Sequence, residues 1–365
     1  MGEEKADWPR DSDSRVIIAD LVEQRKDKIF LASPKSLRGR DGVIPRLSVY
    51  GNSLAEAWEN AMIALFHYGC NIRTDYDRKN GEGNYIDPPS IDCSMDMTIL
   101  NPFAEPVIHR AFPGGIEDLE EYRQEVVEGV KNWMMRDPND PEDKRWEYTY
   151  NERLFCFKAN EKIIDQMAYV IEDLARFPMS RRAQAVTWQV WSDEGNEHPP
   201  CLQRLWFRIL PDEKGYYVLN TNMNFRSRDG YDAAFMNDFA FIDMIKKVAG
   251  KLTERLGREV KIGAFQDISD SFHIYGHRIA DFENRFLKQV TKRSFEDRTW
   301  TMEFANPQFD EARIKVANKI NEAKKGYLEQ LAAGHKISSA EELSRKALGI
   351  GFSGDLTPLI EKYLK

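Results

Sequence analysis

The sequence predicts an α+β fold in which helices are laid on a mixed, mainly antiparallel β-sheet. Three observations lead to this prediction. Apolar residues recur at helical spacing in several long segments, most clearly at residues 53–70 and 163–177. Two strand-like runs, residues 201–210 and 217–224, bracket a turn at 211–215, which predicts a hairpin. The two patterns are mixed along the chain, which is typical of sheets with helices packed on them.

The first half of the chain supplies a loose start, two long helices and at least one strand. Residues 1–14 are mostly charged and polar, so we expect them to be loose. Ser53 is a suitable N-cap for the first long helix. The elements predicted in this half are a short strand at 15–19, a helix at 53–70, a polar loop at 73–83, a strand at 92–100, a helix at 117–135 and a loop at 137–141.

The second half contains the hairpin and ends in helices. Pro178 is expected to end the helix at 163–177, because proline cannot continue a helix. The other predicted elements are a strand at 183–191, the hairpin, a helix at 237–256, a strand at 260–269 and helices from about 312 onward, with breaks near 334 and at 349–354. We therefore expect a main domain at residues 1–304 and a helical C-terminal extension at residues 305–365.

Composition restricts the class of protein. A net charge of −8 argues against a general nucleic-acid binder, so no nucleic-acid partner is expected. The four cysteines are far apart in sequence, which favours free thiols in a reducing compartment over disulfides or a zinc site. No apolar run approaches membrane-spanning length, and the charged N-terminus does not look like a signal peptide. We expect a soluble, cytoplasmic protein with no membrane partner.

Cys201 is the strongest candidate for a nucleophile. It follows Pro199-Pro200 and opens an apolar strand, so the two prolines hold it at a rigid position. The alternative is a buried structural cysteine, because free cysteine behaves as a small hydrophobe.

Two arginine clusters and one pair of polar residues are candidates for substrate contacts. Arg181-Arg182 and Arg226-Ser227 suit a phosphate, since guanidinium groups bind oxyanions through two hydrogen bonds. The alternative for each is solvated surface charge. Asp229 is suited to organise a polar network. The Asn237 amide offers one acceptor and donors, which matches the edge of uracil, although a plain helix N-cap is the simpler interpretation.

A run of polar rings follows in the last predicted strand region. Strand alternation would place His273, Tyr275 and His277 on one side, where they would contact sugar hydroxyls. A metal site is not expected, because no carboxylate or cysteine is spaced nearby to complete it.

Together these segments resemble the thymidylate synthase superfamily. The resemblance covers about residues 148–275 well and the N-terminal third only loosely. It lies in the order and spacing of Tyr148-Thr149-Tyr150-Asn151-Glu152-Arg153, Ile164-Asp165-Gln166-Met167, Pro178-Met179-Ser180-Arg181-Arg182, Trp188, Pro200-Cys201, Arg226-Ser227-Arg228-Asp229, Asn237 and His273-Ile274-Tyr275.

The resemblance implies a folate-dependent one-carbon transfer to C5 of a pyrimidine nucleotide. Cys201 would add to C6, and C5 would then attack the carbon carried by 5,10-methylenetetrahydrofolate. Asn237 would recognise the base, Tyr148 would assist removal of the C5 proton, and His273 and Tyr275 would contact the ribose.

The resemblance also implies how phosphate is held. Arg226 and Ser227 would bind the phosphate, and Arg181 and Arg182 would reach the phosphate in a partner subunit, which implies a homodimer with shared active sites. Asp229 would act in catalysis and contact the folate. We also expect neighbouring arginines to lower the pKa of the Cys201 thiol.

The chain departs from the family pattern at several places. Leu202 follows the nucleophile where the family usually has histidine. The active-site glutamate is assigned to Glu125, with Glu121 as the alternative, because the usual tryptophan-containing segment is missing. Arg73 or Arg78 is expected to replace the missing phosphate loop. The apolar C-terminal tail that closes over folate is also missing.

These departures affect the expected product. A dry, closed site favours hydride transfer to a methyl group, whereas access of water favours a hydroxymethyl group. We therefore expect a dUMP hydroxymethylase, with thymidylate synthase proper and dCMP or CMP hydroxymethylase as alternatives. A relative that only binds nucleotide or RNA is the non-enzymatic alternative. A flavin-dependent enzyme has little support, because no glycine-rich dinucleotide fingerprint is present.

Overall fold

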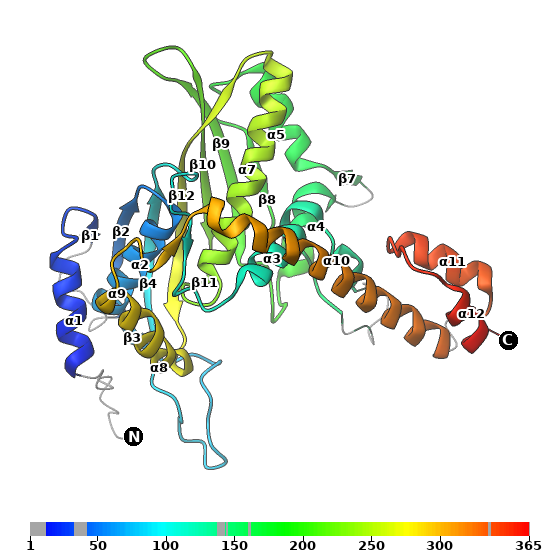
Figure 1. Cartoon of the computed structure of the whole chain (residues 1–365), viewed down its shortest axis with the longest axis horizontal. Helices are drawn as coiled ribbons and strands as arrows, with labels where there is room; N and C mark the ends of the chain where they lie inside the picture. Colours follow the sequence, from blue (N-terminus) through cyan, green and yellow to red (C-terminus); the bar gives the residue numbers. More distant parts are fainter. Residues whose placement is uncertain are drawn as a thin grey trace.

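The computed structural model describes residues 12–32, 42–136, 143, 145–159, 162–334 and 337–364. Its centre is a nine-stranded sheet with the order β1-β2-β4-β12-β10-β9-β8, to which β3 and β11 add at β4 and β12 (Figure 1). The strands are β1 (Ile29–Leu31), β2 (Arg46–Gly51), β3 (Cys70–Ile72), β4 (Ser90–Ile99), β5 (Ile108–His109), β6 (Phe157–Ala159), β7 (Lys162–Ile164), β8 (Gln184–Val186), β9 (Leu202–Pro211), β10 (Tyr217–Phe225), β11 (Arg228–Asp229), β12 (Val260–Ile274) and β13 (Thr299–Trp300).

The sheet is mixed, as predicted. β9 and β10 form the predicted antiparallel hairpin, β10 pairs in parallel with β12, and β12 pairs antiparallel with β4. The pairing of Phe225 with Leu202 brings the end of β10 beside the start of β9. On the next strands, His273 of β12 lies opposite Asp92 of β4. The ends of four strands therefore meet near Cys201.

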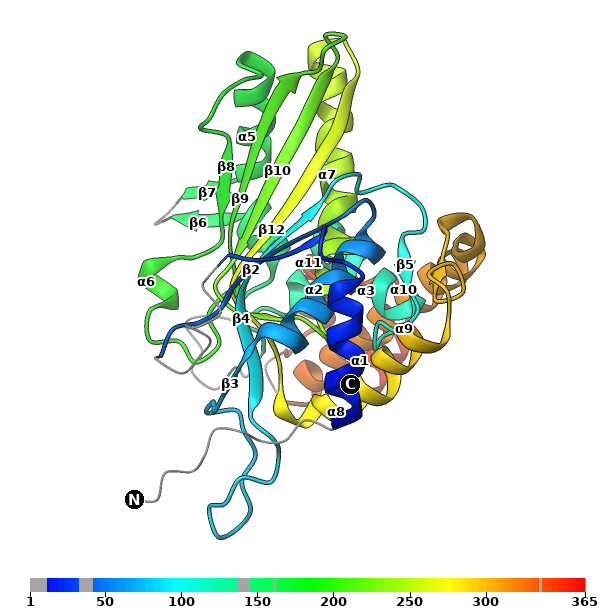
Figure 2. The ribbon, with the colours of Figure 1, turned by 90° about the vertical axis from the view of Figure 1, so that its left-hand side faces the viewer.

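Most of the helices lie on one face of this sheet (Figure 2), whereas α10 leads away from it to α11 and α12 (Figure 1). They are α1 (Ser12–Glu23), α2 (Leu54–Tyr68), α3 (Ile116–Glu128), α4 (Tyr150–Phe155), α5 (Gln166–Arg176), α6 (Val190–Asp193), α7 (Ala234–Leu256), α8 (Ile279–Asp281), α9 (Lys288–Lys292), α10 (Met302–Ala333), α11 (Ala340–Gly349) and α12 (Thr357–Tyr363). Along β9, Leu205, Phe207 and Ile209 are fully buried beneath the helices, whereas Arg204, Trp206 and Arg208 point to the other face. The second face is therefore polar and aromatic, and the helices do not cover it.

Several predicted elements are confirmed. Ser53 caps α2 by accepting a hydrogen bond from the Glu56 backbone N–H at 3.4 Å. The strand predicted at 92–100 is β4, and the segment at 73–83 contains no helix or regular strand. The C-terminal segment is helical with breaks where they were predicted, but α10 begins earlier than expected, at Met302.

The strand predicted at 15–19 is wrong, because these residues belong to α1. Ile18, Leu21 and Val22 are buried, and their spacing of three and four residues is that of a helix face. Of the segment expected to be loose, residues 12–14 lie in α1, and residues 1–11 lie outside the described residues. The loop predicted at 137–141 also lies outside them.

Other boundaries differ for local reasons. The helix predicted at 117–135 ends at Glu128, because Gly129 takes a left-handed conformation with φ of 67°; a short 3₁₀ helix follows at Asn132–Met134. The helix predicted from 163 begins only at Gln166, since Asp165 caps it. The strand predicted at 183–191 is confined to β8 and is followed by α6.

The C-terminal helices have a small core of their own. Ala305 and Phe309 of α10 belong to the main core. Further along, Leu328 packs with Ile337, Leu343, Ala347 and Leu359 in a second cluster. The boundary predicted at 304/305 thus falls near the start of α10. This helix runs from the main core to the small C-terminal core. Within the described ranges, no helix is long and apolar enough to cross a membrane.

Candidate active site

Cys201 lies immediately before β9, beside an arginine from the end of β10. The Arg226 Nη2 lies 3.8 Å from the Cys201 sulfur. The same guanidinium donates to the carbonyls of Pro199 at 2.7 Å and Pro200 at 3.1 Å. The proline pair and the arginine together fix the position of the thiol, which is partly buried.

The expectation of a lowered thiol pKa is wrong for this structure. Burial raises the pKa of the Cys201 thiol, and the opposing effect of Arg226 and Arg228 does not cancel it. Arg228 contributes little because two buried carboxylates already pair with it, Asp238 at 2.6 Å and Asp267 at 2.9 Å. The role of Arg228 is therefore to pair with these two carboxylates in the core.

Two tyrosines pack against the cysteine loop. The Tyr150 hydroxyl accepts a hydrogen bond from the Leu202 backbone N–H at 3.2 Å. The Tyr148 ring lies 5.6 Å from the Tyr150 ring. Burial raises the pKa of Tyr148 to about 12, with a further contribution from the nearby Cys201. Tyr148 therefore remains a neutral hydroxyl at pH 7, close to the thiol.

A pocket of about 600 Å³ opens next to these tyrosines. Its wall includes Tyr122, Glu125, Trp146, Tyr148 and His198. Several further charged side chains also line it: Arg136, Asp143, Arg145 and Glu147. The pocket thus combines aromatic surface with polar groups, directly beside the segment that carries Cys201.

The structure places Glu125, and not Glu121, in the wall of this pocket. The Glu125 carboxylate lies 3.0 Å from the Lys131 ammonium, and its pKa is raised by burial despite that cation. Glu121 pairs with Lys131 at 2.8 Å and with Lys319 of α10 at 2.6 Å. Burial opposes ionisation of Glu121, but the two lysines outweigh it and lower its pKa.

His273 and Tyr275 lie together, but His277 does not continue their strand. β12 ends at Ile274, and His277 lies in a 3₁₀ turn, so the predicted alternation of three rings stops there. The His273 and Tyr275 rings are 4.7 Å apart. Burial lowers the pKa of His273 to about 4. The pKa of Tyr275 is raised to about 12, and burial is the main cause. Cys201 is among the groups that raise the Tyr275 pKa further.

A hydrogen-bond relay fixes the state of His273. Ser271 Oγ lies 2.8 Å from the Asp92 carboxylate and 3.1 Å from His273 Nδ1. Because the hydroxyl has one proton, donation to Asp92 requires His273 to donate from Nδ1. Nε2 is then an acceptor, and this atom is buried without a hydrogen-bond partner among the described residues. The sequence offered no signal for Asp92 or Ser271 as parts of the site.

Asp229 is partly buried next to His273, and Asn237 is buried. Asp229 Oδ1 accepts from the backbone N–H groups of Tyr231 at 3.0 Å and Asp232 at 2.9 Å. Burial raises the pKa of Asp229 to about 7. Asn237 is 7% exposed and lies in the first turn of α7, so the N-cap interpretation is wrong. Asp229 does not line the aromatic pocket.

The other arginines that were predicted to bind phosphate either lie far from Cys201 or are already hydrogen-bonded within the chain. Arg181 and Arg182 are exposed before β8, whose pairing of Gln184 with Trp206 places them toward the far end of β9 from Cys201. Arg78 binds Asp87 through two hydrogen bonds of 2.6 Å, and Arg73 donates to the Asp87 carbonyl at 2.8 Å. Ser227 is half-buried directly after Arg226.

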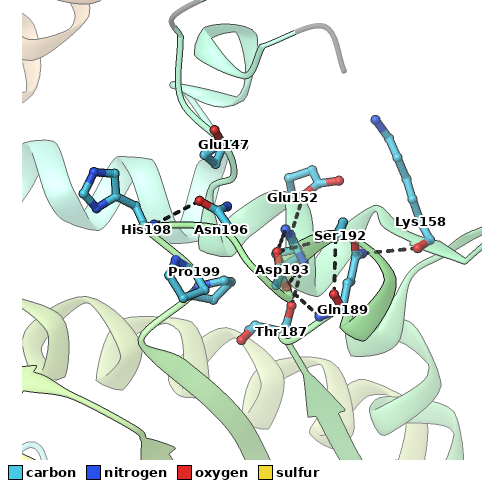
Figure 3. A network of polar contacts seen from close by, with 12 residues as sticks. Glu147, Glu152, Lys158, Thr187, Gln189, Ser192, Asp193, Asn196, His198 and Pro199 are labelled. Atoms are coloured by element: carbon cyan, nitrogen blue, oxygen red, sulfur yellow. Dashed lines mark hydrogen bonds and ion pairs between the residues drawn. The ribbon is translucent and has the colours of Figure 1, made fainter. Parts of the chain in front are cut away.

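A polar network supports the loop that leads to Cys201 (Figure 3). Arg153 forms two hydrogen bonds of 2.8 Å with the Asp193 carboxylate and a third with the Thr187 carbonyl. Asp193 also accepts from the Gln189 backbone N–H at 2.6 Å. Arg153 was part of a sequence motif, whereas Asp193 carried no sequence signal. The pair ties α4 to α6, eight residues before Cys201.

Comparisons with known proteins agree on one family. Residues 114–319 match the family model described as thymidylate synthase. A protein of Methanocaldococcus jannaschii is 29% identical over 66% of this chain and 96% of its own length. One of Methanosarcina barkeri is 31% identical over 63% of this chain and 89% of its own length. Both carry the name "Putative thymidylate synthase".

Among solved structures, a thermostable thymidylate synthase A from Bacillus subtilis aligns with 15% identity and a TM-score of 0.46, covering 65% of this chain and 84% of that chain. The family model spans more than half of the chain, and the curated relatives are matched along nearly their whole length. This chain therefore belongs to the thymidylate synthase family of one-carbon transferases.

Proposed function

We propose that the protein transfers a one-carbon unit from 5,10-methylenetetrahydrofolate to C5 of dUMP, through a covalent bond between Cys201 and C6. One observation carries this proposal. A rigidly held cysteine, 3.8 Å from an arginine, stands beside a neutral tyrosine hydroxyl and an aromatic pocket. A nucleophile, a cation and a proton-transfer group in one place are what covalent activation of a pyrimidine requires.

The residues have separate tasks in this proposal. The Cys201 thiolate adds to C6, which moves electron density to C5 and makes that carbon nucleophilic. C5 then bonds to the one-carbon unit that the folate delivers. The Tyr148 hydroxyl assists removal of the C5 proton, and release of the sulfur from C6 completes the exchange. Burial already raises the pKa of the Cys201 thiol in the free protein. The negative charge of a bound nucleotide would raise this pKa further. Arg226 would offset the substrate charge.

Nucleotide recognition is assigned to the groups that surround Cys201. Arg226 uses Nε and Nη2 on the proline carbonyls, and its remaining donors are assigned to the phosphate together with Ser227. His273 Nε2 is a buried acceptor that suits a ribose hydroxyl, with Tyr275 beside it. Asn237 is assigned to the uracil edge, since its amide supplies both a donor and an acceptor. An alternative substrate with cytosine, dCMP or CMP, would pair differently with this amide.

The aromatic pocket fits the folate co-substrate by its chemistry. Trp146, Tyr122 and Tyr148 offer flat surfaces for a fused ring. Arg136 is paired with Glu147 and Arg145 with Asp143, each at 2.7 Å, and would bind the carboxylates of the folate tail by exchanging these partners. Glu125 is assigned to a ring nitrogen, because burial raises the pKa of its carboxyl and so favours the protonated form, which can donate a proton. Asp229 lies beside His273 on the nucleotide side and is assigned a catalytic role there; it does not line the aromatic pocket, so a contact with the folate would have to form outside that pocket.

Within this activity we favour a hydroxymethyl product. Charged groups line the pocket, among them Arg136, Asp143, Arg145 and Glu147, and such groups hold water near the reacting carbon. Addition of water to the carbon at C5 gives 5-hydroxymethyl-dUMP, whereas hydride transfer gives dTMP. The names of the archaeal relatives favour dTMP, so thymidylate synthase proper is the second candidate.

We propose a homodimer, and the arrangement of the sheet supports it. The sheet face opposite the helices carries Trp206 and Arg208, and a second copy would cover it. Arg181 and Arg182 lie far along β9 from their own Cys201 and are exposed. In a dimer of two such faces they would reach the phosphate held by the partner. The helical extension from residue 305 is proposed as a separate module with its own small core.

The mass of the nucleotide product tests this function. Incubation of the protein with dUMP and methylenetetrahydrofolate is expected to yield 5-hydroxymethyl-dUMP with tetrahydrofolate. Appearance of dTMP with dihydrofolate would replace the hydroxymethylase by the thymidylate synthase alternative. A Cys201→Ala variant is expected to be inactive, and Cys156→Ala, which removes an exposed cysteine, is the matched control. Full activity of Cys201→Ala would overturn the mechanism.

A further inference from the structure

A second pocket, of about 530 Å³, lies away from Cys201 among β5, the start of α3, the region of α9 and the start of α10. Three arginines line it: Arg110, Arg285 and Arg293. No aspartate or glutamate is among the described residues that form its wall. The chain as a whole has a net charge of −8, so a pocket with three cations and no carboxylate departs from its average.

Neutral groups hold two of these guanidinium groups in place. Arg285 donates to the Phe112 carbonyl at 2.6 Å, and Arg110 donates to the Asp297 carbonyl at 2.8 Å. Arg110 also lies over the ring of Trp300, 5.1 Å from its centroid. These contacts orient the side chains without neutralising their charge. Arg153, by contrast, is paired with a buried carboxylate, that of Asp193.

The third arginine has a different environment. Arg293 follows the end of α9, and its backbone carbonyl accepts from Arg298 at 2.6 Å. Its side chain is exposed and forms no ion pair within the described part of the chain. Gln289, on the same wall, donates from its amide to the Arg110 carbonyl at 3.4 Å, while its Oε1 is buried without a partner. Arg293 is thus free to turn toward a ligand.

Two acidic groups near the pocket, Asp118 and Glu59, are already engaged. Asp118 accepts from the Gly115 backbone N–H at 2.7 Å and so caps α3. Beneath the pocket, Glu59 binds Arg298 at 2.6 Å and His109 at 2.8 Å. The Ala111 backbone N–H donates to His109 Nδ1 at 3.1 Å, so this ring donates to Glu59 from Nε2 and is neutral. The positive charge of the pocket therefore comes from its arginines and is not cancelled from below.

We propose that this pocket is a second anion site, which binds the phosphoryl groups of a small molecule through Arg110, Arg285 and Arg293. Guanidinium groups bind phosphoryl oxygens through two parallel hydrogen bonds, and three of them around one cavity suit a polyphosphate. The Trp300 ring already contacts Arg110 and, in a tilted arrangement, Phe304, so the proposal does not assign a stacked base to it. Inorganic polyphosphate and nucleoside triphosphates share this chemistry.

Calorimetric titration of the full-length protein with tripolyphosphate tests the proposal. Excess dUMP is present throughout, so that the site around Cys201 is not available to the probe. The Arg293→Glu variant is expected to bind at least about tenfold more weakly, because one hydrogen bond to a charged group contributes about 1.5–3 kcal/mol. The exposed Arg345 of α11 is remote in sequence from this wall, so Arg345→Glu is the matched control and is expected to keep the affinity of the wild type.

The outcomes separate the possible ligands. Tighter binding of a nucleoside triphosphate than of tripolyphosphate would identify a nucleotide, and equal binding would identify the phosphate chain alone. Equal affinity of the wild type and Arg293→Glu would overturn the proposal. So would an equal loss in Arg345→Glu, since the effect would then come from net charge. An Arg293→Gln variant, which removes the cation without adding an anion, is expected to fall between wild type and Arg293→Glu.

Discussion

The Nη2 of Arg226 lies 3.8 Å from the Cys201 sulfur and only 2.7 Å from the carbonyl oxygen of Pro199. One guanidinium therefore holds the backbone that carries the nucleophile and supplies positive charge beside it. Burial nevertheless dominates and raises the pKa of the thiol. The cation and burial therefore shift the pKa of the same thiol in opposite directions, and a substitution at Arg226 measures the contribution of the cation.

Replacing Arg226 by glutamine is expected to raise the pKa of Cys201 further, since the cation favours the thiolate. At pH 8, less thiolate is then present, and alkylation of Cys201 by iodoacetamide should slow by about tenfold for one pKa unit. Mass spectrometry of the peptide that contains Cys201 measures this rate. Arg204→Gln, on the exposed face of β9, is the control. An unchanged pH profile in the Arg226 variant would show that the arginine acts only on the loop.

Sequence reasoning predicted the elements whose signal is local. The hairpin of β9 and β10 has its turn residues at 211–215, and α2 has its cap at Ser53 and a regular apolar face. The prediction was wrong where a strand-like composition and a helical spacing occur in the same segment. Within residues 15–19, Val16, Ile17 and Ile18 are β-branched and apolar, which favours a strand. Burial of Ile18, Leu21 and Val22 against the core nevertheless favours a helix.

The candidate site divides in the same way. Motif residues such as Cys201, Arg226 and Tyr148 were found because their spacing carries the family pattern. Asp92 was not found, because it lies opposite His273 only through the pairing of β4 with β12 and is linked to the ring through Ser271 of β12. The raised pKa of the thiol was not predicted either, since it depends on burial, which no adjacent residue reveals.

Asp193 is expected to be essential for the loop before Cys201. Its replacement by asparagine removes the carboxylate that holds both Nη atoms of Arg153, whose side chain is 5% exposed, and leaves only the longer contact of 3.5 Å between its Nε and Glu152. Loss of one partner from a buried pair costs about 3–5 kcal/mol of the free energy of unfolding. Urea unfolding measures this change. Glu254→Gln breaks the exposed pair with Lys251 and should cost at most about 1 kcal/mol. A similar small loss for both variants would mean that Arg153 is solvated.

His273 is expected to contribute to nucleotide binding through Nε2. Replacement by phenylalanine removes one neutral hydrogen bond, so the KM for dUMP should rise about threefold to tenfold with a smaller change in kcat. Steady-state kinetics measure both constants. The comparison substrate is 2′,3′-dideoxyuridine monophosphate, which lacks the ribose hydroxyl. Wild type and variant should have similar KM values for this analogue, and a full difference there would show that His273 serves only to pack Tyr275.

Arg181 and Arg182 are expected to act in the partner subunit's site. A variant with both replaced by alanine keeps its cysteine, and Cys201→Ala keeps its arginines, so each should be inactive as a homodimer. Unfolding and refolding an equal mixture should produce hybrids in which one site has both groups. Activity should therefore reappear, at about a quarter of the wild-type level for random pairing of subunits. If the mixture stays inactive, although hybrids form as shown by affinity tags on both chains, the shared site is wrong.

The buried Asp229 is expected to make stability depend on pH. Burial raises its pKa to about 7, against about 3.9 in an unfolded chain. Below pH 4 both states are protonated, so the group has no effect there. Between about pH 4 and about pH 7 the folded state holds a proton that the unfolded state has released, and the free energy of unfolding falls as the pH rises. Above pH 7 this loss is complete.

An Asp229→Asn variant removes this dependence while keeping an oxygen that accepts from Tyr231 and Asp232. Relative to the wild type, its free energy of unfolding should therefore rise between pH 4.5 and pH 7.5 by at least about 1 kcal/mol, since one pKa unit corresponds to about 1.4 kcal/mol. Urea unfolding at both pH values measures the difference. Asp20→Asn, at an exposed position of α1, should change it little. The opposite sign for Asp229→Asn would mean that the carboxylate is charged in the folded protein and that its backbone hydrogen bonds outweigh burial.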